Sequence, residues 1–177
     1  GRCISCKVGS YSEKEESREC TLCPAGRHGI VAKDGSATVR SSLSSACQQC
    51  EVGKYVNLAG NKECFDCPPG SSCGREGMNA SEPCPKGRYT DISNRWNCTA
   101  CPSGRYQNGV GAAKCLFCEA GTYNNGSGST YLGSCLDCGA GKYAAQPGSS
   151  SCQECGKDTF RASKGRHISC ESCLEGK

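Results

Sequence analysis

Twenty cysteines supply most of the chemistry that this sequence of 177 residues can offer. Most of them stand in Cys-x-x-Cys pairs. One such pair closes the stretch from Cys101 to Cys118, which reads Cys-Pro-Ser-Gly-Arg-Tyr, eight further residues, then Cys-Leu-Phe-Cys. Two cysteines at this spacing can bind zinc, exchange electrons with another disulfide, or enter separate structural disulfides. The residues around the pairs decide among these three chemistries.

The zinc and redox interpretations fit the surroundings poorly. Two motifs separated by 13 residues could form a four-cysteine zinc knuckle, but nine motifs in register would need four or five metal ions. Only His28 and His167 are present as additional ligands. Disulfide exchange needs one reactive pair at a helix start within a βαβ unit, and no such unit is predicted. A metal store stays a minor alternative, which zinc content measured against thiol titration would test.

No catalytic constellation accompanies the cysteines, so we expect neither an enzyme nor a cofactor site. His28 occupies the place of an aromatic residue in its repeat, and His167 lies in a basic Lys-Gly-Arg turn. Neither histidine adjoins a nucleophile motif. The net charge is only +4, and charges of both signs alternate, which gives no reason to expect nucleic acid as a partner.

A period of about 17 residues organises the whole chain. The second cysteine of each pair begins the next copy, and we call it the opener. Successive openers are separated by 17, 27, 17, 17, 17, 17, 20, 17 and 18 residues. A period that varies only by insertion predicts a linear array in which each unit stacks mainly on its neighbours. The openers are Cys6, Cys23, Cys50, Cys67, Cys84, Cys101, Cys118, Cys138, Cys155 and Cys173.

The period divides the chain into nine whole repeats between two partial ones. Both ends cut through a repeat, so we expect the segment to come from a longer array. The predicted segments are the tail of a preceding repeat (1–5), repeat 1 (6–22), repeat 2 with an insertion (23–49), repeat 3 (50–66), variant repeat 4 (67–83), repeat 5 (84–100), repeat 6 (101–117), repeat 7 (118–137), repeat 8 (138–154), repeat 9 (155–172) and the start of repeat 10 (173–177).

The composition predicts a fold held by disulfides. Leu, Ile, Val and Phe together make up only about 11% of the residues, so a 17-residue unit has one or two large apolar groups. Fixing the conformation of each residue on folding costs about 1.5 kcal/mol, whereas a disulfide that closes a loop of about 15 residues stabilises the folded state by roughly 3 kcal/mol. We therefore expect an oxidising, extracellular compartment and unfolding on reduction. The sequence contains no run of 18 apolar residues, which is the length that could span a membrane.

Each repeat has room for a pair of short strands and turns. A glycine three residues after most openers permits positive φ, and an aromatic residue two positions later begins an extended stretch. The expected fold class is a small disulfide-rich repeat that forms an elongated, solenoid-like rod of short β-strands and turns with little or no helix. The aromatic residues expected to cover disulfides are Tyr11, Tyr55, Tyr89, Tyr106, Tyr123, Tyr143 and Phe160.

Two repeats depart from the regular pattern. In repeat 4, Ser81 stands where the first cysteine of a pair is due, and the missing thiol has moved to Cys73. Repeat 2 carries a ten-residue insertion, in which Gly35, Ser36 and the run 41–45 predict an exposed loop.

These residues resemble a known family. The tandem Cys-Pro-x-Gly-x-Tyr…Cys-x-x-Cys looks like the ephrin-receptor-like repeats, and it is similar to the first module of tumour-necrosis-factor-receptor cysteine-rich domains. The Cys-Pro-Pro-Gly-Ser-Ser-Cys start of repeat 4 also resembles a form found in that repeat family. Such repeats occur in receptors, matrix proteins and surface proteins of protists, so the likeness specifies fold more than function.

The resemblance implies a disulfide pairing in which each opener joins the first cysteine of the next pair. The implied disulfides are Cys6–Cys20, Cys23–Cys47, Cys50–Cys64, Cys67–Cys73, Cys84–Cys98, Cys101–Cys115, Cys118–Cys135, Cys138–Cys152 and Cys155–Cys170. Cys3 and Cys173 are left over, and we expect each to bond outside the segment. An interlaced pattern, such as Cys3–Cys20 with Cys6–Cys23, stays open because sequence alone does not determine connectivity.

Glycosylation is the one surface modification with a definite signature. Asn79, Asn97 and Asn125 each begin an Asn-x-Ser/Thr acceptor sequence. Asn79 and Asn125 are expected in loops and are the better candidates, because Asn97 adjoins a cysteine. The abundant serines are candidates for O-linked sugars, without assigned sites.

The leading functional prediction is a non-enzymatic, extracellular structural repeat of a glycosylated surface, appendage or fibre protein. Its expected partners are neighbouring copies or adjoining repeats of the same chain. The alternative is a ligand-binding receptor ectodomain with contact surfaces at the insertions 29–46 and 124–132, since loops on a rigid scaffold often carry recognition.

Overall fold

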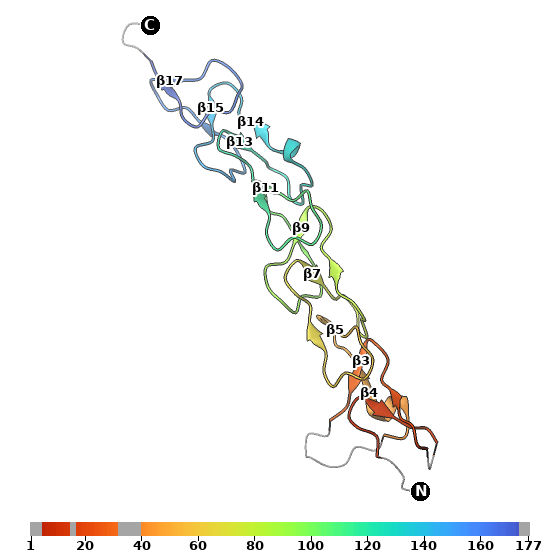
Figure 1. Cartoon of the computed structure of the whole chain (residues 1–177). Coiled ribbons are helices and arrows are strands. Elements are labelled where there is room, and N and C mark those ends of the chain that lie inside the picture. The colour runs from red at the N-terminus through yellow and green to blue at the C-terminus, as the bar shows by residue number, and fades with distance from the viewer. Residues whose placement is uncertain (1–4, 15–16, 32–39, 174–177) are drawn as a thin grey trace. The chain divides into compact units, whose positions relative to one another are not determined.

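The fold consists of short antiparallel strand pairs with very little helix. The computed structural model describes residues 5–14, 17–31 and 40–173 (Figure 1). These residues form two compact units, Gly1–Glu82 with Ile92–Asn97 and Pro83–Asp91 with Cys98–Lys177. Each unit is described by itself below. The boundary passes through repeat 5, because the segment Ile92–Asn97 hydrogen-bonds to repeat 4 of unit 1.

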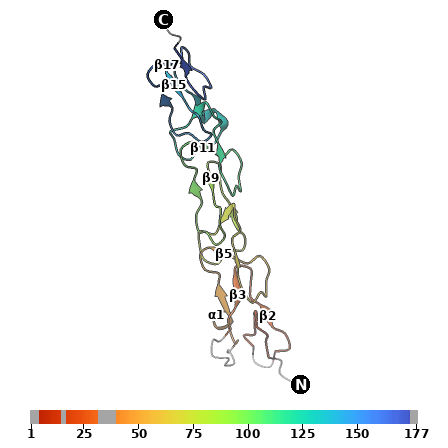
Figure 2. The ribbon, with the colours of Figure 1, turned by 90° about the vertical axis from the view of Figure 1, so that its left-hand side faces the viewer.

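The strands of unit 1 follow the repeats. The paired strands are β1 (Ser10–Tyr11) with β2 (Thr21–Leu22), β3 (Arg27–Gly29) with β4 (Cys47–Gln49), and β5 (Lys54–Tyr55) with β6 (Phe65–Asp66). Repeat 4 contributes β7 (Ser71–Ser72) and β8 (Glu82–Pro83). A helical turn, α1 (Leu43–Ala46), lies beside β1 and β4 near the start of the chain (Figure 2).

Unit 2 repeats the same two-stranded motif five times. Its pairs are β9 (Arg88–Tyr89) with β10 (Thr99–Ala100), β11 (Arg105–Tyr106) with β12 (Leu116–Phe117), β13 (Thr122–Tyr123) with β14 (Leu136–Asp137), β15 (Lys142–Tyr143) with β16 (Gln153–Glu154), and β17 (Thr159–Phe160) with β18 (Glu171–Ser172). A single 3-10 turn, η1 (Leu132–Ser134), accompanies the insertion of repeat 7. The expected class of small disulfide-rich repeats made of short strands and turns is confirmed.

A β-turn directly after each opener from Cys6 to Cys155 starts the first strand of the repeat. In repeat 6, the amide of Arg105 donates to the carbonyl of Pro102 at 3.2 Å, and Gly104 has a φ of 77°. Positive φ at this third turn residue is the requirement of a type II turn, which explains the glycine. In repeat 9 Asp158 takes this position with a φ of 61°, and aspartate is one of the few residues that tolerates it.

The core is a row of sulfur atoms, with a few further buried residues in most repeats. The seven openers from Cys23 to Cys138 are all 0% exposed. The residue six positions after each opener, which we call the core position, is also buried throughout the middle of the chain. Core-position residues that are buried are Gly29, Val56, Cys73, Thr90, Gln107, Asn124 and Ala144.

Two of the aromatic residues expected to cover disulfides pack on the disulfide of the following repeat. Tyr11 packs against the cluster that holds Cys23 and Cys47, and Tyr55 packs against the cluster of Cys67 and Cys73. Phe160 is 45% exposed, so it covers its surroundings only in part.

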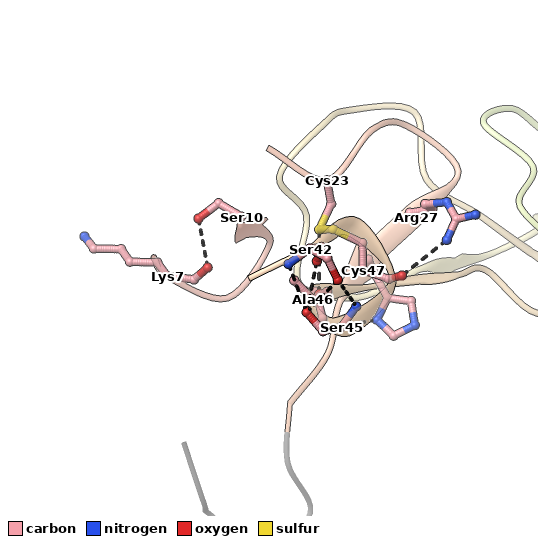
Figure 3. Close-up of a disulfide and its surroundings, with 10 residues drawn as sticks. Lys7, Ser10, Cys23, Arg27, Ser42, Ser45, Ala46 and Cys47 are labelled. Atoms are coloured by element: carbon pink, nitrogen blue, oxygen red, sulfur yellow. Dashed lines mark hydrogen bonds between the residues drawn. A yellow bond between two sulfur atoms is a disulfide. The ribbon is translucent and has the colours of Figure 1, made fainter. Parts of the chain in front are cut away.

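The end of the repeat 2 insertion is more ordered than the sequence suggested. The serine-rich run was expected to be an exposed loop, but Ser42 caps α1 by accepting from the amide of Ser45 at 3.2 Å. Ala46 is 0% exposed and packs in one cluster with Cys23 and Cys47 (Figure 3). The expectation of a loop is therefore wrong for α1, because the last residue of that turn is needed to fill the core. Gly35 and Ser36 lie outside the described residues.

Repeat 4 shows how the same core is built with a displaced cysteine. Cys73 stands at the core position and bonds Cys67, whereas regular repeats place a residue other than cysteine there, such as Val56 or Thr90. Ser81, at the vacated cysteine position, is half-buried.

A double variant that combines Cys73→Thr with Ser81→Cys should therefore convert repeat 4 into a regular repeat. We expect a disulfide between Cys67 and the cysteine introduced at position 81. The free energy of unfolding should lie within about 1 kcal/mol of the parent, since the longer loop gains only a small entropic term. Cys73→Thr alone, which removes the disulfide, should lower the free energy of unfolding by about 2–4 kcal/mol. Disulfide mapping and urea unfolding measure both effects, and an unpaired Cys67 in the double variant would contradict the assignment.

Candidate functional site: the disulfide ladder and the stacking surface

Nine disulfides lie among the described residues, and each joins an opener to the first cysteine of the next pair or, in repeat 4, to Cys73. Their Cα–Cα distances lie between 5.5 and 6.1 Å. Cys6 bonds Cys20, so the interlaced Cys6–Cys23 bond is not formed. The bonded pairs are Cys6–Cys20, Cys23–Cys47, Cys50–Cys64, Cys67–Cys73, Cys84–Cys98, Cys101–Cys115, Cys118–Cys135, Cys138–Cys152 and Cys155–Cys170. These are the pairs that the family resemblance implies.

Cys173 is placed like an opener but has no disulfide partner among the described residues. Its thiol is exposed, and its amide donates to the carbonyl of Asp158 at 2.7 Å. The opener Cys118 makes the equivalent bond to Gly104 at 2.9 Å. Cys3, the other cysteine left over in the sequence, lies outside the described residues.

Backbone hydrogen bonds of one recurring type connect successive repeats within each unit. The amide of the glycine three residues after an opener donates to the carbonyl at the core position of the following repeat, as Gly104 does to Asn124 at 2.7 Å. The described bonds of this type are Gly26–Val56, Gly53–Cys73, Gly87–Gln107, Gly104–Asn124, Gly121–Ala144 and Gly141–Arg161.

The core position also donates forward, so each repeat is held by a second row of bonds. The amide of Gln107 donates to the carbonyl of Ser129 at 2.9 Å, and Ser129 is eleven residues after its own opener. The bonds from the core position to this eleventh position are Gly29–Asn61, Val56–Met78, Cys73–Arg95, Thr90–Ala112, Gln107–Ser129 and Asn124–Ser149.

A third row of bonds starts from the residue ten positions after the opener, which we call the second glycine position. Its amide donates back to the carbonyl of the preceding opener, as Gly128 does to Cys101 at 2.7 Å. The bonds of this row are Gly60–Cys23, Gly77–Cys50, Asn94–Cys67, Gly111–Cys84, Gly128–Cys101, Gly148–Cys118 and Gly165–Cys138.

The second glycine position also brings together repeats that are two apart. A Cβ added at Gly104 of repeat 6 would lie less than 3.0 Å from the carbonyl carbon of Gly148 in repeat 8. Gly148 itself has a φ of 79°, and in repeat 5 the same position is held by Asn94 at 61°. Two backbones therefore touch where side chains would keep them apart. The sequence analysis missed this position, although six of its seven residues in the third row are glycine.

Side chains add less to the stacking than the backbone does. Arg166 in repeat 9 forms ion pairs with Glu119 at 2.6 Å and with Asp137 at 3.6 Å, both in repeat 7. The other ion pairs, such as Lys142–Glu154 at 3.4 Å, lie within one repeat. Apart from Arg161, whose side chain is 19% exposed, these groups are all more than a third exposed, and surface pairs contribute about 0–1 kcal/mol each.

The described residues contain no group of three or more potential metal-ligating side chains. Nor does this part of the chain contain a helix long and apolar enough to cross a membrane. The two histidines bond to nearby carbonyls: His28 Nδ1 lies 3.3 Å from the oxygen of Gly29, and His167 Nε2 lies 3.0 Å from that of Ser163. Among the described contacts, neither histidine bonds to a nucleophilic side chain.

All three acceptor asparagines are exposed. Asn79 and Asn125 lie outside the strands, as the sequence predicted. Asn97 directly precedes the buried Cys98, and its acceptor Thr99 belongs to β10.

Three alanine substitutions separate backbone strain from stacking. Gly139→Ala meets open space at an ordinary φ, and Gly141→Ala meets open space at a φ of 71°. Gly104→Ala combines a φ of 77° with the collision against Gly148. In urea unfolding with intact disulfides, the free energy of unfolding should fall by no more than about 0.5 kcal/mol for Gly139→Ala and by about 1–2 kcal/mol for Gly141→Ala. For Gly104→Ala it should fall by more than about 2 kcal/mol. Equal losses for Gly104→Ala and Gly141→Ala would show that the backbones do not touch.

Comparison with known families agrees with this geometry. A family model described as tyrosine-protein kinase ephrin type A/B receptor-like matches residues 1–39, 73–114 and 104–155, which together cover more than half of the chain. A search of curated proteins finds no matching relative. The disulfide ladder and the matched segments confirm the resemblance noted in the sequence, and the chain belongs to the ephrin-receptor-like family of cysteine-rich repeats.

Proposed function

We propose that the chain is a non-enzymatic structural segment of an extracellular surface, appendage or fibre protein. The observation that carries this proposal is the repetition of three rows of backbone hydrogen bonds from repeat to repeat within each unit. Backbone groups recur at every repeat whatever the side chains are, so this contact suits a repeating support better than a single recognition site. The disulfide content and the family suit an oxidising, extracellular compartment.

The partners we propose are adjoining repeats or neighbouring copies of the same kind. In repeat 6, the amides of Gly104 and Gln107 bond the following repeat. The corresponding amides of repeat 9, those of Asp158 and Arg161, have no such partner among the described residues. A further repeat could bond these groups and offer a cysteine to Cys173, which supports a joined array.

Disulfide mapping of the native protein tests this joining. After alkylation without reduction, we expect Cys173 and Cys3 each in a disulfide-linked peptide whose partner is another cysteine of the array or of a neighbouring subunit. Mild reduction should soften or fragment the assembly. A monomeric protein in which Cys3 and Cys173 are both alkylated as free thiols would contradict the proposal.

Glycans are the second component of the proposed surface. Asn79 and Asn125 are exposed and lie outside strands, so we expect both to carry N-linked sugars, with Asn97 less occupied because Cys98 and β10 adjoin it. Enzymatic deglycosylation in water labelled with oxygen-18 marks each occupied asparagine by mass, because its conversion to aspartate takes one oxygen atom from the water. Occupancy at Asn97 that exceeds occupancy at Asn79 and Asn125 would contradict this ranking. Serine-linked sugars would appear in the same spectra as residual mass.

A receptor ectodomain is the second candidate, and two open concavities in unit 1 favour it. Their volumes are about 380 and 390 Å³, and both are lined by Ile30, Gln48 and Glu51 beside the repeat 2 insertion. The insertion of repeat 7 exposes Tyr131 and Leu132. A full-length transcript that continues into a transmembrane helix and a cytoplasmic signalling domain would favour the receptor. Further repeats in that transcript would favour the structural segment.

A further inference from the structure

Two exposed Asn-Gly dipeptides follow buried core-position amides in unit 2. They are Asn108-Gly109 in repeat 6 and Asn125-Gly126 in repeat 7, after Gln107 and Asn124 respectively. Asn-Gly is chemically labile because glycine has no side chain to shield its nitrogen. That nitrogen loses its proton and attacks the asparagine Cγ, forming a C–N bond as the side-chain nitrogen leaves as ammonia. Water then opens the succinimide to aspartate or isoaspartate.

In both dipeptides the backbone nitrogen of the glycine, which would attack, donates a hydrogen bond to a side chain. The amide of Gly109 donates to Oε1 of Gln107 at 2.9 Å, and the amide of Gly126 donates to Oδ1 of Asn124 at 3.0 Å. The same bond therefore recurs in two successive repeats, from the core-position side chain to the residue two positions on.

The two accepting side chains are themselves fixed. Gln107 is 8% exposed, and its Nε2 donates to the carbonyl of Lys114 at 2.7 Å. Asn124 is 4% exposed, and its Nδ2 donates to Ser129 Oγ at 2.8 Å and to the carbonyl of Arg105 at 3.1 Å. Neither amide can turn away from the glycine without leaving its own donors unbonded in a buried place.

We infer that Asn108 and Asn125 are latent deamidation sites that Gln107 and Asn124 keep unreacted in the folded chain. Attack requires the glycine amide to give up its proton and its bond to a buried acceptor, and both changes raise the barrier. The chemistry concerns water and the chain alone, and at Asn125 it applies to molecules in which that side chain carries no sugar.

This protection bears directly on the stacking. Isoaspartate would insert one extra methylene into the main chain, three residues before Gly111 or Gly128. Each of those amides donates to an opener carbonyl, that of Cys84 or Cys101, at 2.7 Å. A shifted main chain would break a bond of the third row, so a long-lived extracellular array gains from keeping both asparagines intact.

Paired variants at Gln107 separate the hydrogen bond from general rigidity. Gln107→Met removes the acceptor at similar size, whereas Gln107→Glu keeps an oxygen for the Gly109 amide. During incubation of the oxidised full chain, made without N-glycans, we expect Gln107→Met to speed isoaspartate formation at Asn108 at least about fivefold. Gln107→Glu, which keeps the acceptor but loses the donor to Lys114, should speed the reaction less than Gln107→Met does, and Asn125 should keep its own rate in both variants.

The reciprocal pair, Asn124→Leu and Asn124→Asp, should act on Asn125 and leave Asn108 unchanged. Peptide mapping with isoaspartate detection measures each site, and the reduced, alkylated chain provides the unprotected rate. The inference would be overturned if the oxidised parent reacted as fast as that chain. It would also be overturned if Gln107→Met and Asn124→Leu sped both sites alike, because protection would then come from the fold as a whole.

Discussion

The close approach of backbones at the glycine positions is the constraint on which the rest of the structure depends. Each repeat of about 17 residues is too short to bury a conventional core. Its main-chain amides and carbonyls therefore form hydrogen bonds with the neighbouring repeats. Gly104 illustrates this, because its amide bonds Asn124 of the next repeat while its Cα faces Gly148 of the repeat after that. A side chain at Gly104 would separate these backbones and open the rows of bonds.

The disulfides and the stacking bonds have different tasks. A disulfide such as Cys101–Cys115 closes one repeat and restricts its unfolded state, but it makes no covalent link to the next repeat. Order between repeats comes from the hydrogen bonds, above all those at the core position, where Gln107 both accepts from Gly87 and donates to Ser129. The buried sulfur atoms supply the apolar contact that aliphatic residues provide in larger domains.

Much of this arrangement follows from spacing in the sequence. The cysteine period predicted the repeats, and the glycine after each opener predicted the turn with positive φ, as found at Gly104. The period also identified Cys73 as the residue that replaces the thiol missing at Ser81. These features depend on residues close together in the chain, whose types leave few alternatives.

Other features depend on contacts between repeats and were not predictable from one repeat. Asn94 replaces glycine at the second glycine position, so the glycine pattern is broken there although the bond to Cys67 persists. Ala46 gave no signal of burial beside a serine-rich run, since it packs with Cys23 of its own repeat in a cluster that Tyr11 of the preceding repeat covers. The burial of the polar core-position residues Gln107 and Asn124 gave no signal in the sequence, because their main-chain partners Ser129 and Ser149 belong to the next repeat.

Amide hydrogen exchange of the oxidised protein, resolved residue by residue, tests the stacking most directly. The amides of Gly104, Gln107 and Gly128 belong to the three rows and should exchange many times more slowly than that of Gly139, which donates no main-chain bond of this kind. Slow exchange at all three positions would show that the repeats are held together through their backbones. Exchange as fast as at Gly139, with the disulfides intact, would contradict the stacking and leave only a chain of separately closed loops.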